Sequence, residues 1–496
     1  MRILKYKSLL AWLLLLFFSS SGFSQQSLDT SQEISRARTL SELKAYVASA
    51  PFKMKVPSLP QIPALSDTVL RYGAVGDGLQ LSQEAIQKTI DAVAARGGGQ
   101  VVVPPGIYLT GPIRLASRID LHLMEGAVLL FTSDHSHYEI EVKNNKALVA
   151  SPIIADDLTD IAITGTGIIN GRGETWRPMK KEKATEKQWK QLIKSGGALS
   201  EDGLIWWPSL EAGEGASYLK QLNSSSRQLT QADFLAARDF LRPDMVLITD
   251  CKRVLIEGVT LMNAPKFGLV PKRCEDLVIK DVKINNEWYA QNGDGMDIGD
   301  SKRVVVYRCQ VTAGDDAICM KSNYAKKDSG TARLRDVIIA DSKVFRGHGG
   351  FVIGSNEGGG MSNIFVKNCS FIGTDEGVRV KSARDRGGLV ENIFLEDLLM
   401  EDIEGAAISF DSFYDEKKID RISKAVTLST PIFRKFYFKN IFCTSAESGI
   451  RITGLPEMPV SEIYFEKIRI RAAKAYEAVF ARDIHFKDAL INGVKM

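Results

Sequence analysis

Short segments of alternating apolar and polar residues recur along the middle and the C-terminal part of the chain. Each segment alternates, breaks at a polar pair and alternates again, which indicates a β-strand with a sharp turn inside it. The segments cover residues 254–261, 277–284, 304–311, 337–344, 364–371, 393–400 and 463–470. The first six begin 23, 27, 33, 27 and 29 residues apart. A repeat of this length predicts a solenoid.

No strong helical periodicity separates these segments, so leucine-rich and ankyrin repeats do not fit. A right-handed parallel β-helix does, because each coil can bury its apolar face against the next. We therefore predict an all-β fold, a single-domain right-handed parallel β-helix over residues 67–496. A lead-in segment over residues 25–66 is expected before it.

Two regions interrupt the repeat. Residues 81–97 place apolar residues at helical spacing and end in three glycines, which predicts a capping helix over the first coil. Residues 172–243 are rich in Lys, Glu and Gln and include four tryptophans, and residues 231–241 indicate a short helix. We expect a partly helical insertion that projects from one coil. Packing of its tryptophans is favoured over sugar stacking.

The N-terminus has the pattern of a signal peptide. Arg2, Lys5 and Lys7 precede an apolar run over residues 9–18, and small residues follow as far as Ser24. The apolar run is too short to span a bilayer comfortably. We predict a signal peptide over residues 1–24, export to the periplasm or the extracellular space, and no membrane attachment after its removal.

Composition and charge narrow the class of protein. The 496 residues are 44% hydrophobic and 25% charged, which is typical of a globular chain. Length suggests about three domains, although β-rich folds often extend further as one unit. Loss of the leader lowers the formal charge from +4 to +1. Bulk charge therefore gives no reason to expect nucleic acid or membrane partners, and we expect a monomer.

The six cysteines do not form a recognisable metal or redox motif. They are Cys251, Cys274, Cys309, Cys319, Cys369 and Cys443. Export permits disulfides, but no CxxC spacing is present and several cysteines adjoin apolar strand patterns. We predict buried free thiols rather than disulfides. No cofactor and no metal ion are expected.

Four short segments carry the candidate chemistry. They are residues 292–297 (NGDGMD), 314–317 (GDDA), 347–350 (GHGG) and 377–382 (GVRVKS). Asp315 follows Asp294 by 21 residues, close to the length of one coil, so the two should lie on the same side of the solenoid. Singly, each segment is more simply a solvated turn, a calcium-loop fragment or a solvated strand face. Together, in this order and at this spacing, they are far more specific.

The residue types suit hydrolysis of a glycosidic bond. Crowding raises the pKa of one carboxyl group, which then supplies the acid, while ionised carboxylates activate water. His348, Arg379 and Lys381 add local positive charge for an anionic substrate.

The four segments resemble the signature motifs of the glycoside hydrolase family 28 polygalacturonases, which read Asn-x-Asp, Gly-Asp-Asp, Gly-His-Gly and Arg-x-Lys. The resemblance extends from about Tyr72 to the C-terminal coils. It implies a right-handed parallel β-helix that inverts the anomeric configuration of its substrate. Gly293 stands where many members have threonine. The long insertion and the run 347–355 look more like bacterial exo-acting members.

The resemblance also implies roles for single residues. Asp315 resembles the general acid, and Asp294 and Asp316 resemble the residues that hold and activate water. His348 resembles the histidine that supports protonation of the acid. Substrate-binding positions are expected at Arg379, Lys381, Asn292 and Tyr414, the last on a weaker match.

These residues predict cleavage of α-1,4-galacturonosyl bonds in a pectic polysaccharide or oligogalacturonide, from a chain end. Three alternatives stay open. A rhamnogalacturonan-type backbone could be the substrate, a polysaccharide lyase could use the same solenoid, and a β-helix could bind carbohydrate without catalysis.

Overall fold

The computed structural model describes residues 33–225, 227–323, 332–414, 416 and 421–496. The predicted leader lies outside these residues. The chain divides into two compact units between Ser49 and Ala50, inside the predicted lead-in segment. The first unit contains a helix over residues 33–49. Within the described residues, no helix is both long and apolar enough to cross a bilayer.

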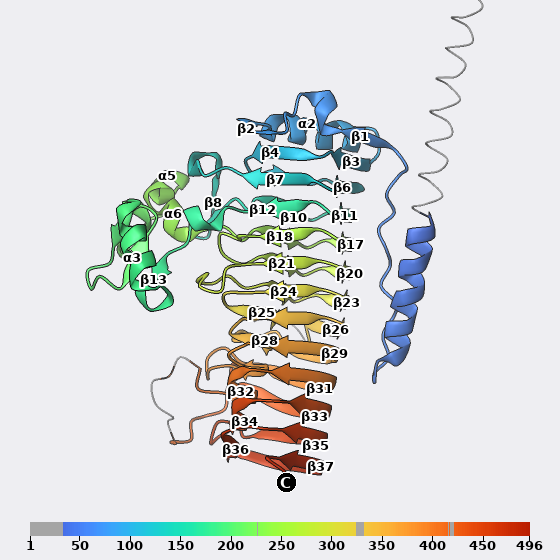
Figure 1. Cartoon of the computed structure of the whole chain (residues 1–496), viewed down its shortest axis with the longest axis vertical. Coiled ribbons are helices and arrows are strands. Elements are labelled where there is room, and N and C mark those ends of the chain that lie inside the picture. The colour runs from blue at the N-terminus through green and yellow to red at the C-terminus, as the bar shows by residue number, and fades with distance from the viewer. Residues whose placement is uncertain (1–32, 226, 324–331, 415, 417–420) are drawn as a thin grey trace, which may run out of the picture. The chain divides into compact units, whose positions relative to one another are not determined.

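The second unit, Ala50–Met496, is a right-handed parallel β-helix, as the repeat predicts (Figure 1). Its strands stack in three parallel faces, here called faces 1, 2 and 3. In most coils the chain passes through face 1, face 2 and face 3 in turn, so strands that pair are one coil apart in sequence.

The strands of face 1 are β1 (Ser66–Thr68), β3 (Gly99–Val103), β6 (Ile119–Leu123), β11 (Thr159–Gly165), β17 (Lys252–Glu257), β20 (Glu275–Lys280), β23 (Lys302–Tyr307) and β26 (Leu334–Ala340). The strands of face 2 are β2 (Asp77–Leu81), β4 (Gly106–Thr110), β7 (Ala127–Phe131), β12 (Ile168–Asn170), β18 (Thr260–Met262), β21 (Lys283–Asn285), β24 (Gln310–Thr312) and β27 (Lys343–Phe345). The long strands that follow cover both faces: β29 (Met361–Ile372), β31 (Leu389–Glu401), β33 (Ile432–Cys443), β35 (Val460–Ile470) and β37 (Ala481–Ile491).

Face 3 is a separate 11-stranded parallel sheet. Its strands are β5 (Ile113–Arg114), β10 (Ile153–Asp156), β16 (Val246–Thr249), β19 (Leu269–Lys272), β22 (Met296–Gly299), β25 (Asp316–Lys321), β28 (Gly349–Ile353), β30 (Val378–Lys381), β32 (Ile403–Asp411), β34 (Ala446–Thr453) and β36 (Lys474–Val479). The short strand β38 (Val494–Lys495) pairs antiparallel with β37 at the C-terminal end.

The predicted break inside each repeat is a turn between faces 1 and 2. Asp281, Arg308, Asp341, Asn368 and Asp397 occupy this turn in successive coils, with φ between +51° and +57°. Asn and Asp tolerate this left-handed conformation better than most residues because their short side chains hydrogen-bond locally. The polar pair in the repeat is therefore the signature of this turn.

A column of apolar side chains forms the interior. The same position of each repeat is fully buried and in register with the next: Val254, Leu277, Val304, Val337, Ile364 and Ile393. Burial of each side chain stabilises the fold by about 1.5–3 kcal/mol relative to exposure. Because every coil lies between two others, the column is continuous and no coil needs a core of its own.

All six cysteines are buried free thiols, as predicted. Burial raises the pKa of Cys274 to about 12 and that of Cys251 to about 11, so both are neutral thiols. They pack as small apolar side chains within the stack.

The predicted capping helix is α2, Gln83–Ala95, at the N-terminal end of the β-helix (Figure 1). Ile86, Ile90 and Val93 are fully buried on one face of it. At Gly99 the backbone has φ +148° and passes so close to Leu65 that an added Cβ would lie 2.3 Å from the Leu65 carbonyl oxygen. Glycine is therefore needed where the chain leaves the helix for the first full coil.

Between β12 and β16 the chain leaves the β-helix and forms a lateral projection (Figure 1). Its elements are η3 (Gly173–Thr175), β13 (Met179–Lys180), η4 (Lys181–Lys183), α3 (Glu186–Lys194), β14 (Ala198–Leu199), β15 (Ile205–Trp207), α4 (Leu210–Asn223), α5 (Gln231–Phe234), η5 (Leu235–Ala237) and α6 (Arg238–Leu241). It packs on a hairpin formed by β8 (Ile140–Lys143) and β9 (Lys146–Val149), which follows η2 (His135–His137). Trp176 is fully buried there, stacked on His135 and edge-on to Tyr138.

The other three tryptophans of this projection also make internal contacts. Trp189 is buried, Trp206 donates a hydrogen bond to the Gly196 carbonyl, and Trp207 packs against Phe240. These contacts agree with a packing role.

Candidate active site

Face 3 positions all four predicted motifs beside one another. Asp294 lies two residues before β22, and Asp316 is the first residue of β25. His348 directly precedes β28, whereas Arg379 and Lys381 lie on β30. The strands β22, β25, β28 and β30 are consecutive neighbours in the sheet. Residues up to 89 positions apart are therefore brought to a few adjacent coils.

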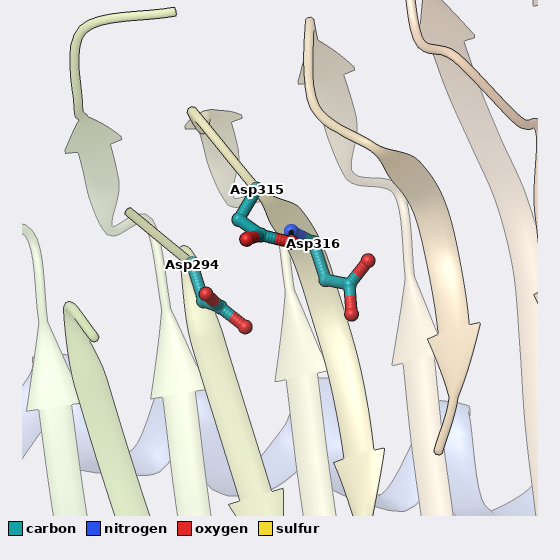
Figure 2. Close-up of side chains that lie close together, drawn as sticks. All are labelled: Asp294, Asp315 and Asp316. Carbon is teal, nitrogen blue, oxygen red and sulfur yellow. Dashed lines mark hydrogen bonds between the residues drawn. The ribbon is translucent and has the colours of Figure 1, made fainter. Parts of the chain in front are cut away.

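Asp294, Asp315 and Asp316 form a carboxylate cluster (Figure 2). One oxygen of each lies within 4.8 Å of one oxygen of each of the others. Asp294 is 3% exposed, and its Oδ1 has no hydrogen-bond partner. Burial, together with the charges of Asp297, Asp315 and Asp316, raises the pKa of Asp294 well above its usual range. Burial and the neighbouring carboxylates therefore favour the neutral form of Asp294.

Asp315 contacts His348. His348 Nδ1 lies 3.1 Å from Asp315 Oδ1, and its Nε2 lies 3.8 Å from Asp375 Oδ2. The hydrogen bond to Asp315 raises the pKa of His348 despite burial. Burial raises the pKa of Asp315, but His348 and then Lys381 outweigh it and hold this pKa below its usual value. In the unliganded site the contact thus favours the imidazolium form of His348 and the carboxylate form of Asp315.

Asp316 is held by the two basic residues of β30. Lys381 Nζ donates a 2.7 Å hydrogen bond to Asp316 Oδ2, and Arg379 Nη1 lies 3.5 Å from Oδ1. Tyr414 completes this group, because Lys381 Nζ lies 4.9 Å and the Arg379 guanidinium 5.6 Å from its ring centroid. The weaker sequence match to Tyr414 therefore lies beside the basic pair.

Asn292 has a different partner. Its Oδ1 accepts a 2.9 Å hydrogen bond from Arg242 Nη2, at the end of the lateral projection. The neighbouring Gly293 fits a crowded turn, since an added Cβ would lie 2.6 Å from the Cβ of Ala290. A threonine at this position would require the loop to shift.

Sequence reasoning missed three ionisable groups near the cluster: two buried carboxyl groups and the partly exposed Lys321. Burial raises the pKa of Asp297 to about 6 and that of Glu357 to about 8. Lys321 donates a 2.7 Å hydrogen bond to the Gly354 carbonyl and lies 3.9 Å from Asp297. Asp297 belongs to the motif that begins at Asn292, so its spacing from Asp294 was a usable signal. Glu357 lies in an irregular segment and gave none.

The carboxylate cluster also has the donor set of a divalent cation site. Two of its three members, however, already have cationic neighbours: His348 beside Asp315, and Lys381 with Arg379 at Asp316. These cations compete with a metal ion for the same oxygens, so the donor set fits an acid–base site better.

Comparisons with known proteins agree with this geometry. The family model described as Glycosyl hydrolases family 28 matches residues 231–484, slightly more than half of the chain. An exo-poly-alpha-D-galacturonosidase of Dickeya chrysanthemi is 27% identical over 405 residues, 78% of this chain and 64% of the relative. The chain thus spans less than two thirds of that relative's length. A probable polygalacturonase of Vitis vinifera is 22% identical over 83% of this chain and 76% of the relative.

A solved structure shares the fold. The crystal structure of a hyperthermoactive exopolygalacturonase from Thermotoga maritima superposes with a TM-score of 0.71 and 25% identity, covering 92% of this chain and 97% of that one. The matched family model includes all four motifs of face 3, and the fold agrees over most of the chain. The chain belongs to family 28 of the glycosyl hydrolases.

Proposed function

We propose that the protein hydrolyses α-1,4-galacturonosyl bonds in pectin or pectic oligosaccharides from a chain end, with inversion. The observation that carries the proposal is the crowded carboxylate cluster of face 3 next to a basic pair. Acids alone suit many glycosidic substrates, whereas the adjoining Arg379 and Lys381 suit a sugar that carries a carboxylate. The names of the relatives from Dickeya and Thermotoga support the same substrate class and exo action.

Asp315 is the proposed general acid. Its pKa is low in the unliganded site because His348 and Lys381 are cationic neighbours. A bound galacturonate would displace water, bring its own negative charge and engage Lys381, and each change raises the pKa of Asp315. The His348 imidazolium, 3.1 Å away, is placed to supply the proton. Binding of the substrate would thus lead to protonation of Asp315, the acid that cleaves the bond.

Asp294 and Asp316 are the proposed water-binding pair. The oxygens of the cluster approach within 4.8 Å, closer than the about 6.5–9.5 Å between carboxyl groups that is common in inverting enzymes. The separation therefore does not by itself favour inversion. The proposal rests instead on the number of carboxylates: with Asp315 as acid, two others remain to hold and activate water. Asp294 would hold the water as the neutral acid, and Asp316, next to Lys381, would accept the proton that the attacking water loses.

Stereochemistry and product type test the proposal. Oligogalacturonides are incubated with the protein and a chelator, and proton NMR follows the first-formed anomer. Inversion of an α-linkage gives a β-anomer first; an α-anomer would contradict it. An unsaturated product that absorbs ultraviolet light would instead show a lyase, and loss of turnover in chelator would show a metal requirement.

Export by way of a cleaved signal peptide is also proposed, because pectic polymers lie outside the cell that degrades them. The basic start and short apolar run of the N-terminus support it. N-terminal sequencing of protein from the periplasm and the medium tests it, with a mature start near residue 25 expected. Recovery of the intact chain in the cytosol would contradict it.

A further inference from the structure

The lateral projection places two arginines near the carboxylate cluster, on the side away from Arg379 and Lys381. Arg177 follows η3 and is 4% exposed, and Arg242 follows α6 and is half-buried. Arg242 donates hydrogen bonds to the Gln291 carbonyl (3.0 Å) and to Asn292 Oδ1 (2.9 Å), in the loop that carries Asp294. The projection is thereby fixed to the site loop by a cation.

Neither arginine has a carboxylate within ion-pair distance among the described residues. Arg177 donates to the Ala264 carbonyl, and the Nε atoms of both guanidiniums have no hydrogen-bond partner. Burial, and for Arg242 also the charge of Arg177, lowers the pKa of both side chains, to about 10 for Arg242. The charges of Asp244 and Asp294 offset part of this effect at Arg242, and those of Glu174 and Glu287 do so at Arg177. Two repelling cations without a directly bound carboxylate remain costly to hold in a protein interior. Such a pair is stabilised when an anion binds between or beside the two.

The position of the pair matches a polymeric anion. Arg242 precedes β16, which lies two strands before β22 in face 3, whereas Arg379 lies on β30, two strands after β25. The carboxylate cluster therefore has a basic pair on each side along the axis of the β-helix. In a galacturonate chain, the units on either side of a cleaved bond carry one carboxylate each. One basic pair is available for each unit.

We propose that Arg177 and Arg242 bind the carboxylate of the galacturonate unit across the cleaved bond from the unit that Arg379 and Lys381 hold. This inference rests on the proposed function. These arginines belong to the projection rather than to the coils. The projection would therefore restrict the sugar unit that binds next to it to one that carries a carboxylate.

The substrates are trigalacturonate and two of its single methyl esters. In each ester, the methyl group is on one of the two units that flank the cleaved bond. Removing a charge-assisted contact should lower wild-type kcat/KM by about 10- to 100-fold for either ester. Arg242→Gln should lower kcat/KM for the free acid by a similar factor, mainly through KM. It should also abolish the penalty for one ester only. Arg379→Gln should abolish the penalty for the other ester.

Arg242→Lys and Lys187→Gln are the companion variants. Arg242→Lys keeps the charge and should retain part of the discrimination, and Lys187 is an exposed cation of α3 whose loss should change nothing. The temperature of unfolding of Arg242→Gln should change little, because the loss of two hydrogen bonds and the relief of repulsion with Arg177 act in opposite directions.

Wild-type ester discrimination in Arg242→Gln overturns the inference, and so does loss of the same ester penalty in both glutamine variants. Equal loss on all three substrates with a lower unfolding temperature shows a structural arginine and also overturns it. If the wild-type protein cleaves none of the three, the proposed function itself fails, which is a separate result.

Discussion

In both face 1 and face 3, stacking of the coils brings an acidic residue next to a residue of the following coil. The two faces differ in whether that neighbour is basic or acidic. On face 1, Arg253 binds Asp160 of the preceding coil through two hydrogen bonds of 2.6 and 2.7 Å. At the turn from face 3 into face 1, Arg273 binds Asp250 of the preceding coil in the same manner at 2.7 Å. On face 3, stacking places Asp294 beside Asp315 and Asp316, and Asp294 Oδ1 receives no hydrogen bond at all.

The difference separates stability from chemistry. A carboxylate paired with a guanidinium stays ionised and gives the coil stack a modest electrostatic gain. Carboxylates that are crowded together repel one another, which destabilises the ionised state. One of them therefore takes up a proton and becomes an acid–base group. The β-helix tolerates this because its apolar column holds each coil independently of the site.

Asp315→Asn should have the largest effect on activity, because it removes the proposed general acid of face 3. Loss of a general acid should lower kcat by about 10²- to 10⁴-fold. The temperature of unfolding should fall slightly, because the change removes the carboxylate that contacts His348 and whose pKa is lowered in the folded protein. Asp402→Asn, at an exposed turn, is the control and should leave both quantities unchanged. Full activity of Asp315→Asn would show that the acid is another group.

Leu277→Ala should weaken the apolar column without touching the chemistry. A cavity at this fully buried position should lower the free energy of unfolding by about 2–5 kcal/mol. The kcat at 25 °C should remain within a factor of two or so, since the side chain is in face 1. Chemical denaturation measures the loss, with Leu399→Ala at a partly exposed position as control. A loss below that of the control would mean that the column does not hold the coils together.

Glu357→Gln should change how stability depends on pH. The pKa of Glu357 rises from 4.5 to about 8 in the folded protein, so between these values the folded state holds a proton that the unfolded state has lost. Its contribution to the free energy of unfolding therefore falls with rising pH, by up to about 1.4 kcal/mol per pH unit. Glutamine stays neutral and should remove this slope. Urea denaturation at pH 5 and 7.5 measures it.

The control for that slope is Glu404→Gln, at an exposed position. It should leave the wild-type pH dependence intact. The prediction fails if Glu357→Gln and Glu404→Gln show the same difference in stability between the two pH values.

Arg273→Gln should have the smallest effect. The Arg273–Asp250 pair is more than 40% exposed at both side chains, so solvent screens it. Its loss should lower the free energy of unfolding by less than about 1 kcal/mol and leave activity unchanged. A larger loss at low salt that shrinks at high salt would show that the coil stack depends on its ion pairs more than on its apolar column.

The sequence predicted the coils and the four motifs for a physical reason. Alternation with a period of two indicates which side chains are buried, and a polar pair indicates a turn, and both patterns depend only on residues that are neighbours in sequence. The sequence was therefore enough to place Val254 and Leu277 in one column. Asp294 and Asp315 could be placed together because their spacing is close to one coil.

Contacts between distant segments could not be predicted in the same manner. Arg242 reaches Asn292 from the end of an irregular insertion, and no periodicity relates the two positions. Burial and neighbouring carboxylates raise the pKa of Asp294, whereas His348 holds that of Asp315 below its usual value. That difference depends on a 3.1 Å contact with His348, which spacing alone does not fix.

The central claim is that the face 3 cluster hydrolyses galacturonosyl bonds at a chain end. The most direct measurement is a time course of products from defined oligogalacturonides in the presence of a chelator. We expect monogalacturonate as the new short product from the first time points, with no unsaturated sugar, and release at least about 100-fold slower by Asp315→Asn. A mixture of intermediate oligomers at the start would contradict chain-end action, and an unsaturated product would contradict hydrolysis.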